Sequence, residues 1–211
     1  MNSPWGSILV LSEAFGMLAP QWGLPRVEVQ PGGRYVTASA TDIKTLLGSC
    51  VAACLYDPAA KVAGLNHFLL AAPRYAKDMP FTATDAGRYG IHAMELLITD
   101  MQKLGAKRSC LRAKIFGGAS VLGFSATDRF LCVNEVNQRF IRDYLEAEHI
   151  PIISEDMGGS LGRVIHFHSD SYSVFRRFIR KSETKVVEED EHKFWRKAVE
   201  AKPAEGEAIL F

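Results

Sequence analysis

The stretch at residues 45–70 constrains the fold more than any other part of the chain. It reads TLLGSCVAACLY, then DPAA, then KVAGLNHFLL: two runs of small and apolar residues separated by a turn signal. Such runs on either side of a short turn with Asp and Pro are typical of a β-hairpin. We therefore expect a hairpin here, with residues 57–60 as its loop.

Strand and helix patterns alternate through the rest of the chain. The run at residues 34–41 has β character, and apolar residues recur at helical spacing before Gly105, a typical helix-ending residue. A second helix is expected at residues 134–149. Further strands are expected at residues 111–116, 150–154 and 163–168, with 172–180 as a possible extension of the sheet. This order predicts a single domain of the α/β (α+β) class. The apolar stripe of the first helix comprises Ile91, Met94, Leu97, Ile98, Met101 and Leu104.

The two ends of the chain differ in character from the middle. Residues 1–33 end in a Gln-Pro-Gly-Gly turn signal and are expected to form an N-terminal extension. Residues 181–211 mix acidic and basic side chains with few aliphatic ones, which indicates a solvated tail. The domain itself is therefore predicted to span residues 34–180.

Composition narrows the class of function. The formal net charge is +1, so no strong field favours nucleic acid or an anionic membrane as a partner. No apolar segment approaches the ~20 residues that span a bilayer, and we expect a soluble, cytoplasmic protein without membrane insertion. The four cysteines form no CxxC pair and no zinc-like spacing with histidine, so neither a metal nor another cofactor is expected.

The hairpin brings one cysteine near one histidine. If Tyr56 and Lys61 flank the loop, Cys50 pairs directly with His67 on one face, with Cβ atoms roughly 5 Å apart. A histidine beside a thiol can activate it as a nucleophile and later activate water. Thr45, Ser49 and Asn66 are nearby candidates for a group that orients the histidine, although Asn66 is expected on the opposite face of its strand.

An ordinary structural role is the competing interpretation. A cysteine in an apolar strand is usually a small buried hydrophobic residue, and we assign that role to Cys54, Cys110 and Cys132. On the residues alone, Cys50 could belong with them.

The motifs TLLGSCVAACLYDP and GLNHFLL resemble the signature of the chemoreceptor glutamine deamidases, the CheD family. RYGIHAMELLITDM, AKIFGGAS and DMGGSLGRVIHF follow in the order that this family shows, so the resemblance spans about residues 35–180. It implies a catalytic set of Cys50, His67 and a threonine. In some members the threonine lies six residues before the cysteine, which is Lys44 here; a one-residue gap assigns the role to Thr45.

The resemblance also implies a substrate and a fold. Members of this family convert glutamines on the cytoplasmic helices of methyl-accepting chemotaxis proteins to glutamates, and some bind a CheC-type phosphatase. Their fold is similar to the catalytic domain of cytotoxic necrotizing factor toxins, a layered α/β arrangement. Two alternatives stay open: a non-catalytic adaptor for the phosphatase or the receptor, and another thiol hydrolase or transglutaminase that uses the same pair.

Three further motifs have weaker implications. The glycine pair at residues 116–119 could form a loop beside the site that admits a substrate helix, or a plain turn. Neither this pair nor the one at residues 156–159 resembles a phosphate-binding loop, because no Lys-Ser/Thr follows. His166 and His168 share one face of a strand, as metal ligands sometimes do, but no third ligand is evident in the sequence nearby.

Overall fold

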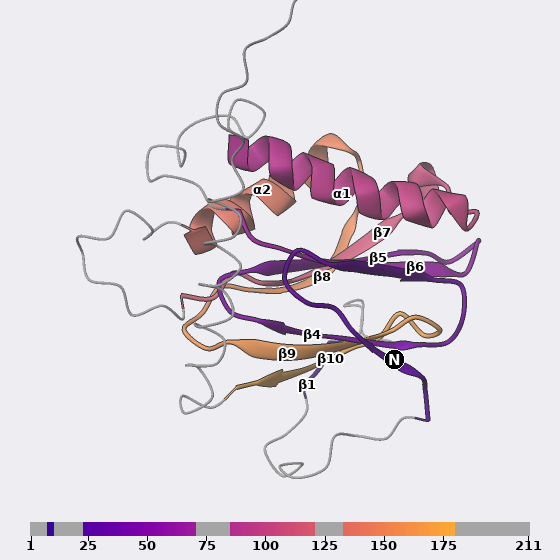
Figure 1. Cartoon of the computed structure of the whole chain (residues 1–211), viewed down its shortest axis with the longest axis horizontal. Coiled ribbons are helices and arrows are strands. Elements are labelled where there is room, and N and C mark those ends of the chain that lie inside the picture. Colours follow the sequence, from indigo (N-terminus) through magenta and orange to yellow (C-terminus); the bar gives the residue numbers. More distant parts are fainter. Residues whose placement is uncertain (1–7, 11–22, 71–84, 121–132, 180–211) are drawn as a thin grey trace, which may run out of the picture.

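The computed structural model of the protein describes residues 8–10, 23–70, 85–120 and 133–179. These residues form two long helices, ten strands and one short 3₁₀ helix (Figure 1). The elements are, in chain order, β1 (Ile8–Val10), β2 (Arg26–Glu28), β3 (Arg34–Thr37), β4 (Asp42–Leu47), β5 (Val51–Asp57), β6 (Val62–Phe68), α1 (Asp85–Lys103), η4 (Arg108–Cys110), β7 (Arg112–Gly117), α2 (Val133–Ala147), β8 (Ile152–Met157), β9 (Arg163–His168) and β10 (Val174–Phe178).

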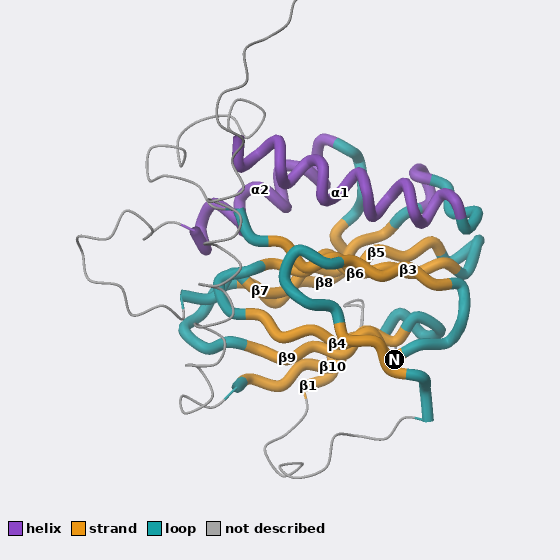
Figure 2. The backbone as a smooth tube through the Cα atoms, viewed as in Figure 1, coloured by secondary structure: helices purple, strands orange, loops and turns teal. Residues whose placement is uncertain are grey.

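The strands form two sheets that stack on each other, and both helices cover the outer face of one of them (Figure 2). The helix-covered sheet has the order β3-β6-β5-β7-β8, and the second sheet has the order β1-β10-β9-β4-β2. The predicted layered α+β architecture is therefore confirmed, as one helical layer and two sheet layers. A sheet covered on both faces must consist of strands that are apolar on both faces, which explains why β5 is buried at all seven positions.

Alternate residues of β5 belong to two different cores. Val51, Ala53 and Leu55 pack among the helices, whereas Ala52 and Cys54 pack between the two sheets. The helical core is completed by the stripe predicted for α1, whose residues Met94, Leu97, Ile98 and Met101 are fully buried. Leu104 is the exception: it lies beyond the end of α1 and is 47% exposed. Gly105 ends the helix with φ +98°, as its position predicts.

The predicted hairpin exists, but its predicted register is wrong. The loop comprises residues 58–61 instead of 57–60, Asp57 pairs with Val62, and His67 therefore lies opposite Ala52 rather than Cys50. Asp57 causes the shift, because its side chain accepts hydrogen bonds from the backbone N–H groups of Ala59 and Ala60 and so turns the chain one residue later. Moving a loop of constant length by one residue changes the register by two, which leaves every side chain on its predicted face.

A second correction concerns the first strand of that hairpin. The run TLLGSCVAACLY does not form one strand: it divides into β4 in one sheet and β5 in the other, joined by the three residues 48–50. We refer to residues 48–50 as the crossover. The segment before Arg34 also takes part in the fold, since β1 pairs with β10 and β2 pairs with β4.

No helix within the described residues is long and apolar enough to cross a membrane. Cys50, Cys54 and Cys110 are free thiols, and Cys132 lies outside the described residues.

Candidate active site

Three predicted site residues come together where the two sheets face each other. Thr45 lies on β4 of one sheet, His67 lies on β6 of the other, and Cys50 ends the crossover between them. Cys50 is two positions before Ala52, the residue opposite His67. It is therefore a diagonal neighbour of His67 on the same face, roughly 7–8 Å away between backbones and within reach of side chains. All three residues are at most 2% exposed.

The hydrogen bonds of Thr45 define the protonation pattern of His67. The Thr45 hydroxyl donates to the Val29 carbonyl oxygen at 2.7 Å, because a carbonyl can only accept. The same hydroxyl lies 2.8 Å from His67 Nδ1, and its single hydrogen is already used. Nδ1–H must therefore be the donor, which leaves Nε2 of the neutral ring with a lone pair. Nε2 is buried and has no hydrogen-bond partner among the described residues.

Burial also determines the charge of this histidine. Loss of solvent lowers the pKa of His67 from 6.5 to about 4, opposed by the nearby Val29 carbonyl. The imidazole is thus neutral at neutral pH. A neutral ring with a free Nε2 lone pair can take up a proton from a neighbouring thiol, as a general base does.

The crossover is held by hydrogen bonds to three successive carbonyl groups. Gly48 O accepts from Ala119 N at 2.8 Å, Ser49 O from the Asn137 side chain at 3.2 Å, and Cys50 O from Gly118 N at 2.7 Å. The glycine pair at residues 116–119 therefore lies beside Cys50. That this loop admits a substrate helix stays a prediction. Gly117 has φ +114°, and a Cβ there would lie 2.1 Å from Cys50 O, so only glycine allows this approach.

The second glycine pair supports the first. Gly158 N donates to Gly117 O at 2.8 Å, and Ser120 N donates to Gly159 O at 2.8 Å. Arg163, which is 1% exposed, forms hydrogen bonds to the backbone carbonyls of Asp156 and Gly158. The two glycine motifs thus act together as a backbone frame behind the crossover.

A pocket adjoins His67 at the start of α1. Its lining includes His67 and Phe68 from β6, and Tyr89 and His92 from α1. Tyr89 is 39% exposed, and its pKa is raised first by burial and then by negative charge on Cys50. The phenol therefore lies within electrostatic range of the Cys50 thiol, and the pocket itself connects the start of α1 with His67.

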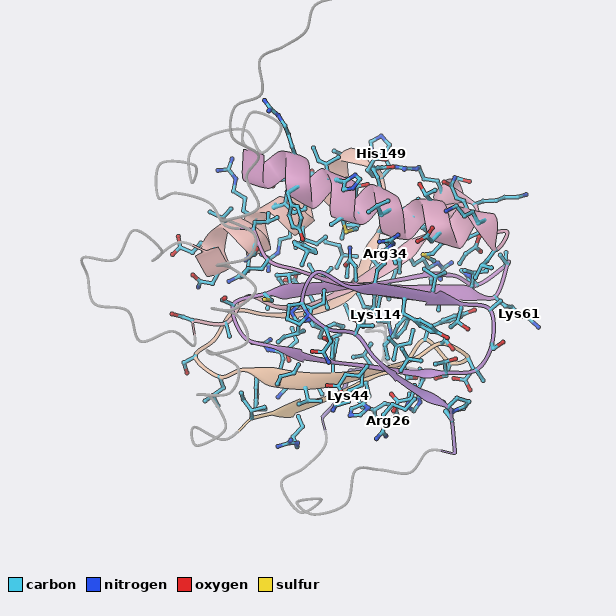
Figure 3. The ribbon with its side chains drawn as sticks, viewed as in Figure 1. Arg26, Arg34, Lys44, Lys61, Lys114 and His149 are labelled. Atoms are coloured by element: carbon cyan, nitrogen blue, oxygen red, sulfur yellow. The ribbon has the colours of Figure 1, made fainter. Side chains whose placement is uncertain are left out.

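The other orienting candidates lie elsewhere. Asn66 faces the helices, as predicted, and its amide donates to Ala93 O at 3.3 Å. Ser49 is buried in the crossover and contributes its carbonyl to Asn137. Lys44 points away from the sheet interface to Glu28, with Nζ 3.1 Å from the carboxylate (Figure 3). Of the two threonine alignments, the geometry brings only Thr45 to the histidine.

His166 and His168 do acquire an acidic neighbour, which was not evident in the sequence. His166 Nδ1 lies 3.0 Å from the Asp42 carboxylate, and His168 Nε2 lies 3.9 Å from it. Arg26 Nε also contacts Asp42, at 2.7 Å. No group of three or more His, Cys, Asp or Glu residues in the described part of the chain is arranged to hold a metal ion.

Two contributors to the site were missed in the sequence. The Val29 carbonyl has no sequence signal, because any residue can supply a backbone oxygen. Asn137 did have one: it stands three residues before Phe140 and four before Ile141, in register with the apolar stripe of α2, where it is completely buried. A polar side chain in that register requires hydrogen-bond partners and therefore marks a specific contact.

Comparisons with known proteins agree on one family. The family model described as "CheD chemotactic sensory transduction" matches residues 71–178. "Probable chemoreceptor glutamine deamidase CheD 1" of Geobacter sulfurreducens is 48% identical over 87% of this chain and 92% of its own length. "Probable chemoreceptor glutamine deamidase CheD 2" of Shewanella oneidensis is 49% identical over 82% of this chain and 88% of its own.

Among solved structures, Neisseria meningitidis protein NMB0706 matches with a TM-score of 0.37 and 14% identity, over 66% of this chain and 64% of that one. The sequence relatives cover both the signature motifs and most of the chain. This chain belongs to the CheD family.

Proposed function

We propose that this protein is a chemoreceptor glutamine deamidase, with Cys50 as nucleophile, His67 as general base and acid, and Thr45 as the group that orients His67. Its close relatives are named for this activity. The observation that carries the residue roles is the chain of hydrogen bonds from His67 Nδ1 through the Thr45 hydroxyl to the Val29 carbonyl. It leaves Nε2 unprotonated on the face of β6 that Cys50 shares.

The reaction follows from this arrangement. His67 Nε2 takes the thiol proton as Cys50 Sγ attacks the carboxamide carbon of a glutamine side chain. The tetrahedral intermediate collapses when the imidazolium returns that proton to nitrogen, and ammonia leaves. The resulting thioester is hydrolysed by a water molecule that Nε2 deprotonates, which releases glutamate and restores the thiol. Throughout, the Nδ1–H to Thr45 bond favours the ring charge that forms transiently.

The setting of the reaction is part of the proposal. The substrate is a glutamine on a cytoplasmic receptor helix, so the enzyme acts in the cytoplasm. The side chain of this glutamine enters through the pocket beside His67 and Tyr89. A CheC-type phosphatase is the proposed regulatory partner. Because Cys50 and His67 are almost fully buried, only a slender side chain can reach them.

The deciding experiment is mass spectrometry of a folded receptor cytoplasmic fragment incubated with the wild-type protein or with Cys50→Ala. We expect glutamine-to-glutamate conversion, +1 Da at defined sites, with the wild type alone. Cys54→Ala is the matched control, since it removes a buried thiol four residues further along the chain, in the same core between the two sheets.

The other outcomes each lead to a different conclusion. Conversion by both the wild type and Cys50→Ala would exclude Cys50 as the nucleophile. No conversion by either, with the fragment shown to be helical, would favour a non-catalytic adaptor that binds the phosphatase or the receptor helices. Transfer of an added amine in place of hydrolysis would indicate a transglutaminase.

A further inference from the structure

A single buried amide connects the two segments that carry the proposed nucleophile and base. Asn137, in the first turns of α2, is 0% exposed. Its Nδ2 donates to Ser49 O at 3.2 Å, next to Cys50, and its Oδ1 accepts from Leu70 N at 2.8 Å, three residues after His67. Donor and acceptor of one side chain thus contact the crossover and the end of the β6 segment.

Both segments need support at these points. The crossover at residues 48–50 lies between two strands of different sheets, so its carbonyls have no partners within a strand ladder. β6 ends at Phe68, so Leu70 lies beyond its ladder as well. Unpaired buried backbone groups are costly, and the Asn137 side chain satisfies one on each segment.

The position itself does not require an amide for packing. Asn137 is in register with Phe140 and Ile141 on the buried stripe of α2. An apolar side chain could fill this space without the cost of removing a polar amide from water. What the amide adds is a fixed spacing between the backbones at residues 49 and 70. That spacing determines how Cys50 Sγ and His67 Nε2 approach each other, and an error of about 1 Å in such an approach can cost on the order of 100-fold in rate.

We propose that Asn137 is a positioning residue that holds the Cys50 crossover and the His67 segment in reactive register. Of the two measurements that test this role, only the deamidation rate rests on the proposed function. The reactivity of the Cys50 thiol reports the same geometry without any receptor substrate. Asn137 does not line the pocket beside His67, so it acts on the reacting pair and not on substrate binding.

The principal test compares Asn137→Ala with the wild type by two measurements. In receptor-fragment deamidation we expect kcat to fall between about 10- and 100-fold, with KM unchanged within about twofold. In the second measurement, iodoacetamide labelling is followed at each cysteine by peptide mass spectrometry. We expect labelling of Cys50 to slow at least about fivefold, since the thiol loses its aligned base, while Cys54 stays unlabelled.

Cys54 distinguishes positioning from a loss of structure. Cys54 is fully buried in the middle of β5, opposite Leu65 and without a histidine beside it, and burial raises the pKa of its thiol. We therefore expect it to react only when the sheets separate. Labelling of Cys54 together with loss of activity would show that Asn137 merely maintains the fold, and would overturn the proposal. Unchanged Cys50 labelling and kcat would overturn it equally. Asp143→Asn, at an exposed ion pair on the same helix, is the control and should change neither readout.

Asn137→Asp provides a version of the test that depends on pH. A protonated carboxyl can donate to Ser49 O and accept from Leu70 N, as the amide does, whereas a carboxylate repels the Ser49 carbonyl. The ratio of the variant's kcat to that of the wild type should therefore fall as pH rises. A ratio that is low and independent of pH, equal to that of Asn137→Ala, would contradict the hydrogen-bond basis of the positioning. If the wild type deamidates nothing, the proposed function fails, while the labelling ratios still decide the role of Asn137.

Discussion

Cys50 and Cys54 lie on the same face of one chain segment, four residues apart, yet their surroundings differ completely. Both are 0% exposed and both contribute to the core between the sheets. Cys54 lies in the middle of β5, opposite Leu65 on one side and Lys114 on the other, and burial raises the pKa of its thiol. Lys114 lies between the two sheets (Figure 3).

Cys50 stands where the strand begins. Its carbonyl is held by the glycine loop at residues 117–118, and His67 with its Thr45 partner is the diagonal neighbour. Neither residue type nor burial therefore distinguishes the proposed nucleophile Cys50 from Cys54. The distinction comes from the ending of a strand ladder, which frees backbone and side chain for other partners.

The largest expected effect tests this contrast directly. Cys50→Ser should lower kcat/KM for receptor glutamine deamidation by 10³-fold or more, because a hydroxyl is a far weaker nucleophile with this base. Cys54→Ser should leave kcat/KM within about threefold. The measurement is the initial rate of ammonia release from a receptor fragment. Comparable losses of kcat/KM in both variants would show that Cys50 has no catalytic role that Cys54 lacks.

Thr45→Val should have the next largest effect. Valine keeps the shape but removes the hydroxyl between His67 and Val29, so the ring loses its orientation and its defined tautomer. We expect kcat to fall on the order of 100-fold, with partial recovery in Thr45→Ser. Lys44→Met, one residue earlier on the opposite face of β4, is the control. If Lys44→Met impaired kcat as strongly, the assignment of the threonine would be wrong.

The pH dependence of stability should reveal the neutral His67. Its pKa is lowered to about 4 in the folded protein, against 6.5 in the unfolded chain. Between these values only the unfolded state takes up the proton, so the free energy of unfolding falls as pH drops from 6.5 to 4, by roughly 3 kcal/mol in total. Urea titrations at pH 7 and pH 4 should show this loss in the wild type.

His67→Gln should abolish that contribution, while a substitution of the exposed His149 should retain it. A wild-type profile that coincides with the profile of His67→Gln would mean that His67 is not buried as a neutral base.

The smallest expected effect concerns the loop that holds Cys50. Gly117→Ala combines strain at φ +114° with a Cβ that would lie 2.1 Å from Cys50 O. Gly105→Ala has comparable strain at φ +98° but nothing within 4 Å. We expect Gly117→Ala to lower the free energy of unfolding by about 1–3 kcal/mol more than Gly105→Ala, measured by thermal denaturation. Equal losses of unfolding free energy would mean that the backbone near Cys50 shifts to make room for the added methyl group at no measurable cost.

The sequence allowed the elements and the faces of the site to be predicted, but not its connections. Periodicity located α1 and α2, and the Asp-Pro turn located the hairpin. The predicted pairing of Cys50 with His67 was wrong, but the two residues still lie on one face, because an error of two residues preserves the face. The division of the predicted strand at Gly48 was missed, since a glycine within a run of small residues resembles an ordinary strand position.

The hydrogen bonds that organise the site were beyond sequence reasoning for another reason. Val29 contributes a backbone oxygen, which has no residue signature, and Leu70 N is a backbone group too. Asn137 is more than sixty residues from either segment that it joins, so nothing local links them. Such contacts depend on how the layers stack, which no local pattern encodes.

The Val29 carbonyl has a consequence for where this enzyme can be cut. A fragment that begins at Arg34 would keep Cys50, His67, Thr45 and both glycine loops. In that fragment the Thr45 hydroxyl has lost the Val29 carbonyl as its acceptor and can donate its hydrogen to His67 Nδ1 instead. The ring hydrogen would then be on Nε2, and Nε2 could not act as a base. The smallest catalytically competent fragment is therefore longer than the signature motifs, because it must include the Val29 carbonyl.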